Sequence, residues 1–279
     1  MNSPWCAYFI SSAMHKDQPL SSFFVSPPDK KPPSSKARWL NIALVAAFII
    51  GIGWFAVARL NYHFDWEVLW RFRIKILRGY SMTFVITIIS LILSLLIGTL
   101  SALGLEGRVL FFKYLARAYV EGIRSTPFLV QINFFYFIIA TALGMNNKYL
   151  LGILILSIFT GAYVTEIIRG GLQSIPESQW MTIRSLSFTK SQAYRFIIFP
   201  QVFRRILPAL AGQLSSLVKD SSLLSVIAVS ELTKSVLEAD AITFRTFENL
   251  TFLAVGYMVI TIPISLISKY LERKFYYES

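Results

Sequence analysis

The chain has 279 residues, of which 55% are apolar and only 15% are charged, and its mean hydropathy is positive. This composition disfavours a soluble domain and predicts an all-α, polytopic membrane protein. A net charge of +12 would also suit nucleic-acid binding, but positive charge in a membrane protein more often fixes cytoplasmic loops and meets anionic lipid. The single cysteine, Cys6, excludes a disulfide framework or a cysteine-based metal site within one chain.

The N-terminal region is predicted to be a disordered cytoplasmic tail over residues 1–37. Its stretch 26–35 holds four prolines, and each proline removes a backbone donor and restricts the residue before it. The apolar run 40–57 follows, and it is close to the ~20 residues that a bilayer core requires. We therefore expect an extra N-terminal transmembrane helix over residues 38–58.

Residues 59–79 are predicted to form an interfacial amphipathic segment, because aromatic residues alternate there with cations. The basic residues are Arg59, Arg71, Arg73, Lys75 and Arg78. In a six-span topology this segment would be external, where such a basic excess is unusual. A misplaced first span is the competing explanation.

Five further apolar runs predict five more spans, at residues 83–103, 127–143, 150–168, 206–230 and 250–268. In the first of these, Gly98 and Ala102 have the spacing that favours close helix packing. Lys219 and Asp220 interrupt the fourth. Because polar backbone at membrane depth must lie against protein or a wet cavity, the break predicts either a kinked or re-entrant element beside the pathway, or a helix that ends near Asp220 with residues 221–230 at the outer interface.

The loop charges predict which loops are cytoplasmic. Residues 104–126 carry four basic groups against two acids, and residues 169–205 carry six against one. Residues 219–248 carry five acids against three bases. Since short Lys/Arg-rich loops stay inside, the first two loops and both basic termini should be cytoplasmic and the acidic loop external.

Five blocks of the chain carry a family resemblance: 119–131, 161–171, 174–180, 200–208 and 217–227. In order and spacing they resemble the permease subunits of ABC importers of the polar amino-acid uptake family, and the similarity covers roughly residues 66–275. The resemblance implies a type I ABC importer-like transmembrane domain with five core helices over residues 80–270, followed by a cytoplasmic tail at 271–279. The first span lies outside it.

The resemblance places a coupling loop, the surface that docks on an ATPase, at residues 172–200. The family's Glu-Ala-Ala falls on Met181, Thr182 and Ile183, and its glycine falls on Ser187, so the acid and the turn glycine are both missing. Only glycine takes a positive φ without strain. The expected ATPase-coupling residues are Trp180, Met181, Ile183, Ser187, Phe188, Ile197 and Pro200, with Leu186 as a further apolar knob. An ordinary basic loop is the alternative.

Polar residues within the apolar runs are candidates for a translocation path. Glu166 is the one ionisable residue well inside a continuous run, where charge is costly and needs a partner. It is either part of the path or a structural carboxylate held by Arg169, three residues on. The path candidates are Arg124, Thr126, Glu166, Lys219 and Asp220.

The chain has no phosphate-binding loop, since Gly51 and Gly53 lie within a span and no Lys-Ser/Thr follows. We expect no catalytic residue, metal or cofactor in this chain, with ATP and Mg²⁺ on the partner. The resemblance implies a multi-pass permease of the bacterial cytoplasmic (inner) membrane. Its partners would be ABC ATPase subunits, a second permease subunit, an external solute-binding protein and membrane lipid, and its substrate a polar amino acid such as arginine, histidine or glutamine. An ion-coupled secondary transporter and a membrane-embedded enzyme are the alternatives, but clear internal repeats and clustered intramembrane catalytic groups are not evident.

Overall fold

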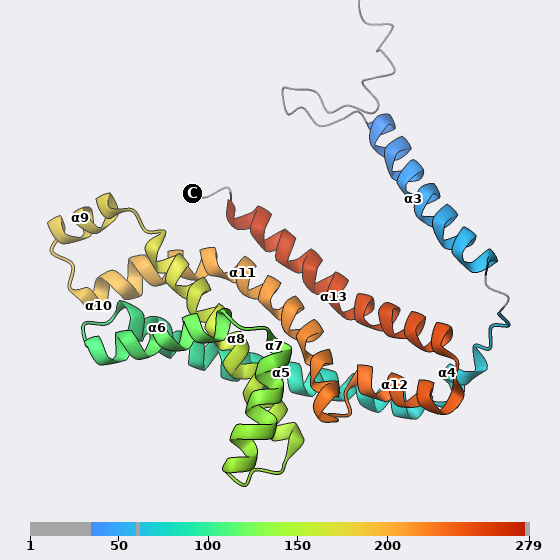
Figure 1. The fold of residues 1–279 in the computed structure, drawn as a ribbon. Helices are drawn as coiled ribbons and strands as arrows, with labels where there is room; N and C mark the ends of the chain where they lie inside the picture. The colour runs from blue at the N-terminus through green and yellow to red at the C-terminus, as the bar shows by residue number, and fades with distance from the viewer. Residues whose placement is uncertain (1–34, 60–61, 277–279) are drawn as a thin grey trace, which may run out of the picture. The chain divides into compact units, whose positions relative to one another are not determined.

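The structure, a computed structural model, describes residues 35–59 and 62–276 (Figure 1). The predicted tail lies almost wholly outside these residues. The chain divides into two compact units, Met1–His63 and Phe64–Ser279. In the first unit the described element is helix α3, Ser35–Ala58.

The second unit is built from helices throughout its described part. They are α4 (Glu67–Arg71), α5 (Arg73–Glu106), α6 (Leu110–Arg124), α7 (Phe128–Asn133), the π-helix η1 (Phe134–Ala140), α8 (Lys148–Gln173), α9 (Glu177–Ser185), α10 (Lys190–Gln192), the π-helix η2 (Ala193–Ile198), α11 (Phe199–Asp220), the 3₁₀ helix η3 (Ser221–Ile227), α12 (Leu232–Thr243) and α13 (Thr246–Tyr276). The all-α prediction is confirmed.

In the described ranges, four helices are long and apolar enough to cross a membrane: α3, α5, α8 and α13. The bent pair formed by α6 and the α7–η1 segment is either a broken fifth span or a re-entrant loop. Helix α11, which covers most of the predicted run 206–230, is not among them, because its charged residues lower its hydropathy. The charged residues are Arg204, Arg205, Lys219 and Asp220.

A sharp bend separates α6 from α7. The two helices meet at 110°, and Pro127 stands at the N-cap of α7 with an extended backbone. Proline lacks the N–H that would continue α6, and its ring disfavours a helical residue before it. The apolar element therefore begins after Pro127, where the run 127–143 was predicted to begin.

Helices α5 and α8 pack side by side in the centre of the second unit (Figure 1). They run in the same direction, because Ser90 donates to the carbonyl of Ile153 while Gly98 lies against Gly161 further along both helices. A Cβ added at Gly98 would lie 3.0 Å from the Gly161 carbonyl oxygen. Gly98 and Ala102 are both buried, so they permit the close packing that their spacing predicted.

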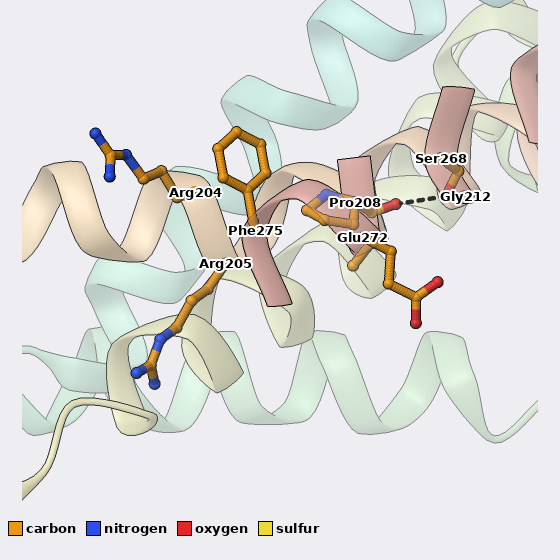
Figure 2. Close-up of a pocket in the computed structure, with 8 residues that line it drawn as sticks. Arg204, Arg205, Pro208, Gly212, Ser268, Glu272 and Phe275 are labelled. Atoms are coloured by element: carbon orange, nitrogen blue, oxygen red, sulfur yellow. Dashed lines mark hydrogen bonds between the residues drawn. The ribbon is translucent and has the colours of Figure 1, made fainter. Parts of the chain in front are cut away.

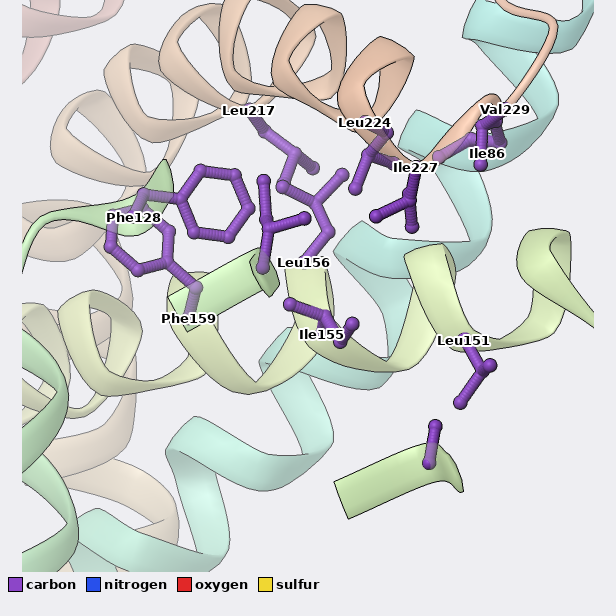
Figure 3. Close-up of a cluster of buried hydrophobic side chains, with 12 residues drawn as sticks. Ile86, Phe128, Leu151, Ile155, Leu156, Phe159, Leu217, Leu224, Ile227 and Val229 are labelled. Atoms are coloured by element: carbon purple, nitrogen blue, oxygen red, sulfur yellow. The ribbon is translucent and has the colours of Figure 1, made fainter. Parts of the chain in front are cut away.

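The main core surrounds the middle of α8 (Figure 3). The rings of Phe128 and Phe159 stack with centroids 4.1 Å apart, and Leu156, Leu217 and Leu224 are fully buried beside them. Helices α7, α8 and α11 and the 3₁₀ helix η3 thus converge on one apolar cluster. This cluster fixes where α11 ends relative to α8.

The interruption at Lys219 and Asp220 is a change of helix type. Helix α11 ends at Asp220, η3 continues the chain, and Ala228 then adopts a left-handed backbone with φ 59°. The predicted helix end near Asp220 is confirmed, and the placement of residues 221–230 at the outer interface stays a prediction. The 3₁₀ turn packs Leu224 and Ile227 into the main core, so it belongs to the packed bundle.

Candidate functional site

Helix α9 is the first element of the predicted coupling loop. Pro176 stands at its N-cap with φ −63° and ψ 146°, where the missing N–H costs nothing because the first turn has no internal acceptor. Glu177 in the first turn and Arg184 in the last both match the helix dipole. The Pro-Glu sequence thus begins the helix, which spans nine residues.

Ser187 terminates α9 in a left-handed conformation with φ 57°. The N–H of Ser187 donates to the carbonyl of Arg184 (3.0 Å), and the N–H of Phe188 donates to that of Ile183 (3.3 Å). These two bonds make a Schellman motif, which ordinarily places glycine at this position. The strain predicted for a serine in the glycine position is therefore present in the backbone.

The second half of the loop is nearly continuous helix. Thr189 and Gln192 form a reciprocal capping box at the start of α10, which satisfies two otherwise unpaired donors. The π-helix η2 follows and leads into α11. The widened turn lies directly before Pro200, where the proline lacks an N–H and crowds the preceding turn.

The loop has an apolar core of its own. Ile183 of α9 is buried against four residues that come from the start of the loop, η2 and α11, namely Ile175, Ala193, Ile198 and Val202. Trp180 and Ile197 are partly buried beside this cluster, and the Trp180 ring meets Tyr194 edge to face at 5.8 Å. Packing of this kind holds α9 against α11 as one rigid element.

The predicted coupling residues therefore occupy two different environments. Ile183, Trp180 and Ile197 face the loop core, although Trp180 and Ile183 were expected to be docking knobs. Met181, Leu186 and Phe188 face outward, with 56%, 64% and 38% of their surface exposed. The two sets follow from helical geometry, since neighbouring positions of a short helix point to different sides.

A hollow of about 600 Å³ lies between α11 and α13, next to the loop (Figure 2). Ser268 donates to the carbonyl of Pro208 across it, while Arg204 and Arg205 point to different sides of α11. Arg205 donates to the carbonyl of Ser174 at 2.6 Å. This bond ties the end of α8 to α11, and the only local pattern that points to it is the Arg-Arg pair.

An ion-pair cluster joins α6 to α8. Arg169 donates a hydrogen bond to each carboxylate oxygen of Glu166, at 3.0 and 2.7 Å, as their spacing of three residues predicted. Arg124 approaches the same carboxylate at 3.2 Å and lies over the ring of Tyr163. The cluster lines a polar hollow of about 480 Å³ between α5, α6 and α8. Two arginines on one carboxylate keep it charged and oriented.

The other path candidates lie elsewhere. Thr126 accepts a hydrogen bond from Gln131 at 2.7 Å, in the turn between α6 and α7. Lys219 is exposed and Asp220 is half-buried. For the described part of the chain, neither forms an ion pair with Glu166. The structure thus brings Arg124 and Glu166 together, whereas Lys219 and Asp220 lie apart from them at the end of α11.

A buried carboxylate that sequence reasoning missed organises α12. Glu231 is fully buried and caps the helix by accepting from the N–H groups of Thr233 and Lys234 at 2.8 Å. The Tyr257 hydroxyl donates to the same group at 2.9 Å. Burial raises the pKa of Glu231 and these hydrogen bonds oppose the rise. An acid directly before a helical stretch was the available signal.

The chain is similar to known transport proteins over most of its length. The glutamine transport system permease protein GlnP of Escherichia coli is 33% identical over 213 residues, which cover 76% of this chain and 97% of GlnP. The probable glutamine ABC transporter permease protein GlnM of Bacillus subtilis is 36% identical over 199 residues, covering 70% and 91%. A crystal structure of an amino acid ABC transporter with histidines aligns with a TM-score of 0.71 at 32% identity, over 76% of this chain and 100% of that chain.

The fold also matches at lower identity, since an inward-facing structure of the MetNI methionine ABC transporter gives a TM-score of 0.59 at 17% identity. The family model described as "Binding-protein-dependent transport system inner membrane component" matches residues 94–276. The resemblance found in the sequence blocks, the importer-like fold class and the membrane location are thereby confirmed. The chain belongs to the inner-membrane permease components of binding-protein-dependent ABC importers.

Proposed function

We propose that this chain, paired with a second permease subunit, forms the transmembrane pathway of an importer for a polar amino acid. A separate ATPase would drive it and an external solute-binding protein would deliver the substrate. The glutamine permeases among its relatives and the amino acid transporter with the same fold support this class of substrate. An ion-coupled transporter has no comparable support.

The observation that carries the proposal is the rigid loop formed by α9, η2 and the start of α11. Its apolar core holds Ile183 inside and leaves Met181, Leu186 and Phe188 exposed on a polar, basic surface. A preformed apolar ridge binds a partner without the entropic cost of ordering a flexible loop. We propose that this ridge docks on the ATPase.

The predicted coupling residues then have different roles. Met181 and Phe188 would contact the ATPase, while Trp180, Ile183 and Ile197 would act by keeping the loop rigid, because they pack on its core. Ser187 sets the direction in which the chain leaves α9, and Pro200 marks the junction with α11. Movement of the ATPase would reach α8 and α11 together, since Arg205 links their ends.

ATP and Mg²⁺ belong to the partner in this proposal. The chain offers no glycine-rich strand-to-helix loop with a following lysine, which is the arrangement that cradles nucleotide phosphates. ATP hydrolysis would therefore act on this chain only by moving the coupling loop. The permease itself would carry out no chemical step.

The candidate residues of the translocation path lie in two separate regions of the second unit. Arg124 and Glu166 line the polar hollow between α5, α6 and α8, Thr126 lies in the turn that follows α6, and polar groups at membrane depth mark wet cavities or substrate paths. Lys219 and Asp220 stand where α11 changes to a 3₁₀ turn. We propose that the first group holds the cytoplasmic end of the path and that the second lines its middle.

Copurification and transport measurements test the proposal. The permease, its ATPase and its binding protein are reconstituted in proteoliposomes, and uptake of labelled glutamine, histidine and arginine is measured with ATP inside or with an ion gradient alone. Uptake of at least one of them should require ATP and the binding protein. Uptake driven by the ion gradient without ATP would contradict the proposal.

Alanine variants test the coupling surface in the same system. Truncating a buried interface anchor typically costs ~2 kcal/mol or more, which is roughly thirtyfold in affinity. Phe188→Ala should loosen the ATPase and abolish solute-stimulated hydrolysis, and Trp180→Ala should do the same by disturbing the loop core, while both variants still insert. Met181→Glu should be tolerated. Phe137→Ala, at an exposed phenylalanine of η1 outside the loop, is the control and should stay fully coupled.

A further inference from the structure

An apolar groove of about 640 Å³ lies between the end of α5 and the first part of α6. Its apolar walls include Ile97, Leu100, Leu103, Phe112, Leu115 and Tyr119. Four of these side chains, Leu100, Leu103, Phe112 and Leu115, are 56–60% exposed, so the described part of the second unit leaves the groove open. Exposed apolar surface on membrane-spanning helices faces lipid tails or a neighbouring helix.

One cation stands at the end of this groove. Arg108 lies in the turn between α5 and α6, between Gly107 and Val109, and all three line the groove. Arg108 is exposed, and within residues 35–59 and 62–276 it forms no ion pair. The next cations of α6, Lys113 and Arg117, line the separate polar hollow with Glu106 and Glu121. Helix α6 therefore has a charged hollow on one side and an apolar groove with a single cation on the other.

The length of the groove matches one leaflet of a bilayer. Ile97 lies nine residues before the end of α5 at Glu106, which is about 14 Å along a helix axis. Half of a ~30 Å hydrocarbon core is about 15 Å. Because the basic loop 104–126 is predicted to be cytoplasmic, Arg108 would lie at the inner headgroup level and Ile97 near the bilayer centre.

We propose that this groove binds an anionic diacyl phospholipid of the inner leaflet, with an acyl chain along α5 and the phosphate on Arg108. The groove offers one cation at one end and apolar walls along its length, which is the pattern of a lipid with a charged head and a long tail. Two other polar side chains, Ser101 and Tyr119, line the groove, and the Tyr119 hydroxyl is already used, since it donates to the carbonyl of Ile158 at 2.6 Å. The site is independent of the substrate and of the ATPase.

A charge variant tests the headgroup contact. The purified permease complex is titrated with phosphatidylglycerol or with phosphatidylcholine, and each bound lipid is counted by native mass spectrometry. The complex should retain one phosphatidylglycerol per copy of this chain in preference to phosphatidylcholine. Arg108→Gln should reduce that preference about fivefold, the value expected for one cation at a membrane surface. Lys113→Gln removes an equal charge outside the groove and should leave the preference unchanged.

A steric variant tests the tail contact. Leu100→Trp would fill the groove and should weaken both lipids, whereas Leu96→Trp, one turn earlier, 58% exposed and outside the groove, should not. Equal lipid binding in all four variants would overturn the proposal. It would also be overturned if Leu100→Trp separated the permease pair without changing lipid retention, because the groove would then be a contact between permease subunits.

Discussion

Replacing Ser187 by glycine should stabilise the end of α9. Ser187 adopts φ 57° at the position that closes the helix, and both backbone bonds of the closing motif pass through this turn. Its side chain is exposed and forms no hydrogen bond within the described residues. The substitution therefore removes backbone strain and no favourable contact.

The size of the effect follows from two opposing terms. A left-handed backbone costs a residue with a Cβ about 1–2 kcal/mol, and glycine removes that cost. Glycine also loses more conformational freedom on folding, which costs roughly 0.5–1 kcal/mol. The net gain is about 0.5–1 kcal/mol, so local opening of the turn should become about two- to fivefold rarer.

Hydrogen exchange measures this opening directly. The exchange takes place in the intact protein and is read from the fragment that covers residues 177–188. In that fragment the amides of Ser187 and Phe188 should exchange two- to fivefold more slowly in Ser187→Gly than in the natural chain. Ser187→Ala keeps the strain and removes only the hydroxyl, so its exchange should match that of the natural chain. Exchange that is unchanged or faster in the glycine variant would show that this turn is not strained.

Three other variants or conditions have defined outcomes. In a Cys6→Ser background, a cysteine at Ser178 should be labelled only from the cytoplasmic side, because its loop carries six basic groups; labelling from outside would refute the topology. Gly98→Ala should lower the melting temperature, since a Cβ there would lie 2.5 Å from a methyl of Val164, whereas Gly122→Ala meets nothing within 4 Å and should be neutral or stabilising. Hydrogen bonding from Lys75 lowers the pKa of Glu238. The pair should therefore stabilise the fold above the usual Glu pKa, and this stability should be lost as the pH falls through the lowered pKa. If the melting temperatures of Glu238→Gln and of the natural chain differ by the same amount at every pH from 7 to 3.5, the pair makes no such contribution.

Local patterns predicted the parts of the site that depend on neighbouring residues. The spacing of three between Glu166 and Arg169 predicted a contact that the structure contains, because residues at that spacing share a helix face. The loss of the family glycine at Ser187 predicted strain at the turn, and φ is positive there. In each case the relevant geometry lies within one or two helical turns.

Contacts between segments that lie far apart in the sequence could not be predicted from such local patterns. The sequence suggested Ile183 as an outward knob, but the structure packs it against Ile198 and Val202. A nine-residue helix has two sides, and which side faces inward depends on where α11 returns. Arg124, 42 residues before Glu166, likewise joins the carboxylate only through the packing of α6 on α8.

The start of α5 shows why an apolar run and a helix need not have the same ends. Helix α5 spans 34 residues, about 51 Å, whereas a bilayer core is about 30 Å thick. Hydropathy identified only the part suited to hydrocarbon, which began at residue 83. The ten residues before it, about 15 Å of helix, extend beyond that run, and there Lys75 pairs with Glu238 of α12 at 2.8 Å. Three cations of the predicted interfacial segment, Arg73, Lys75 and Arg78, therefore lie on an extension of α5 beyond the apolar run, where they can be solvated or paired, whereas Arg71 ends the short helix α4.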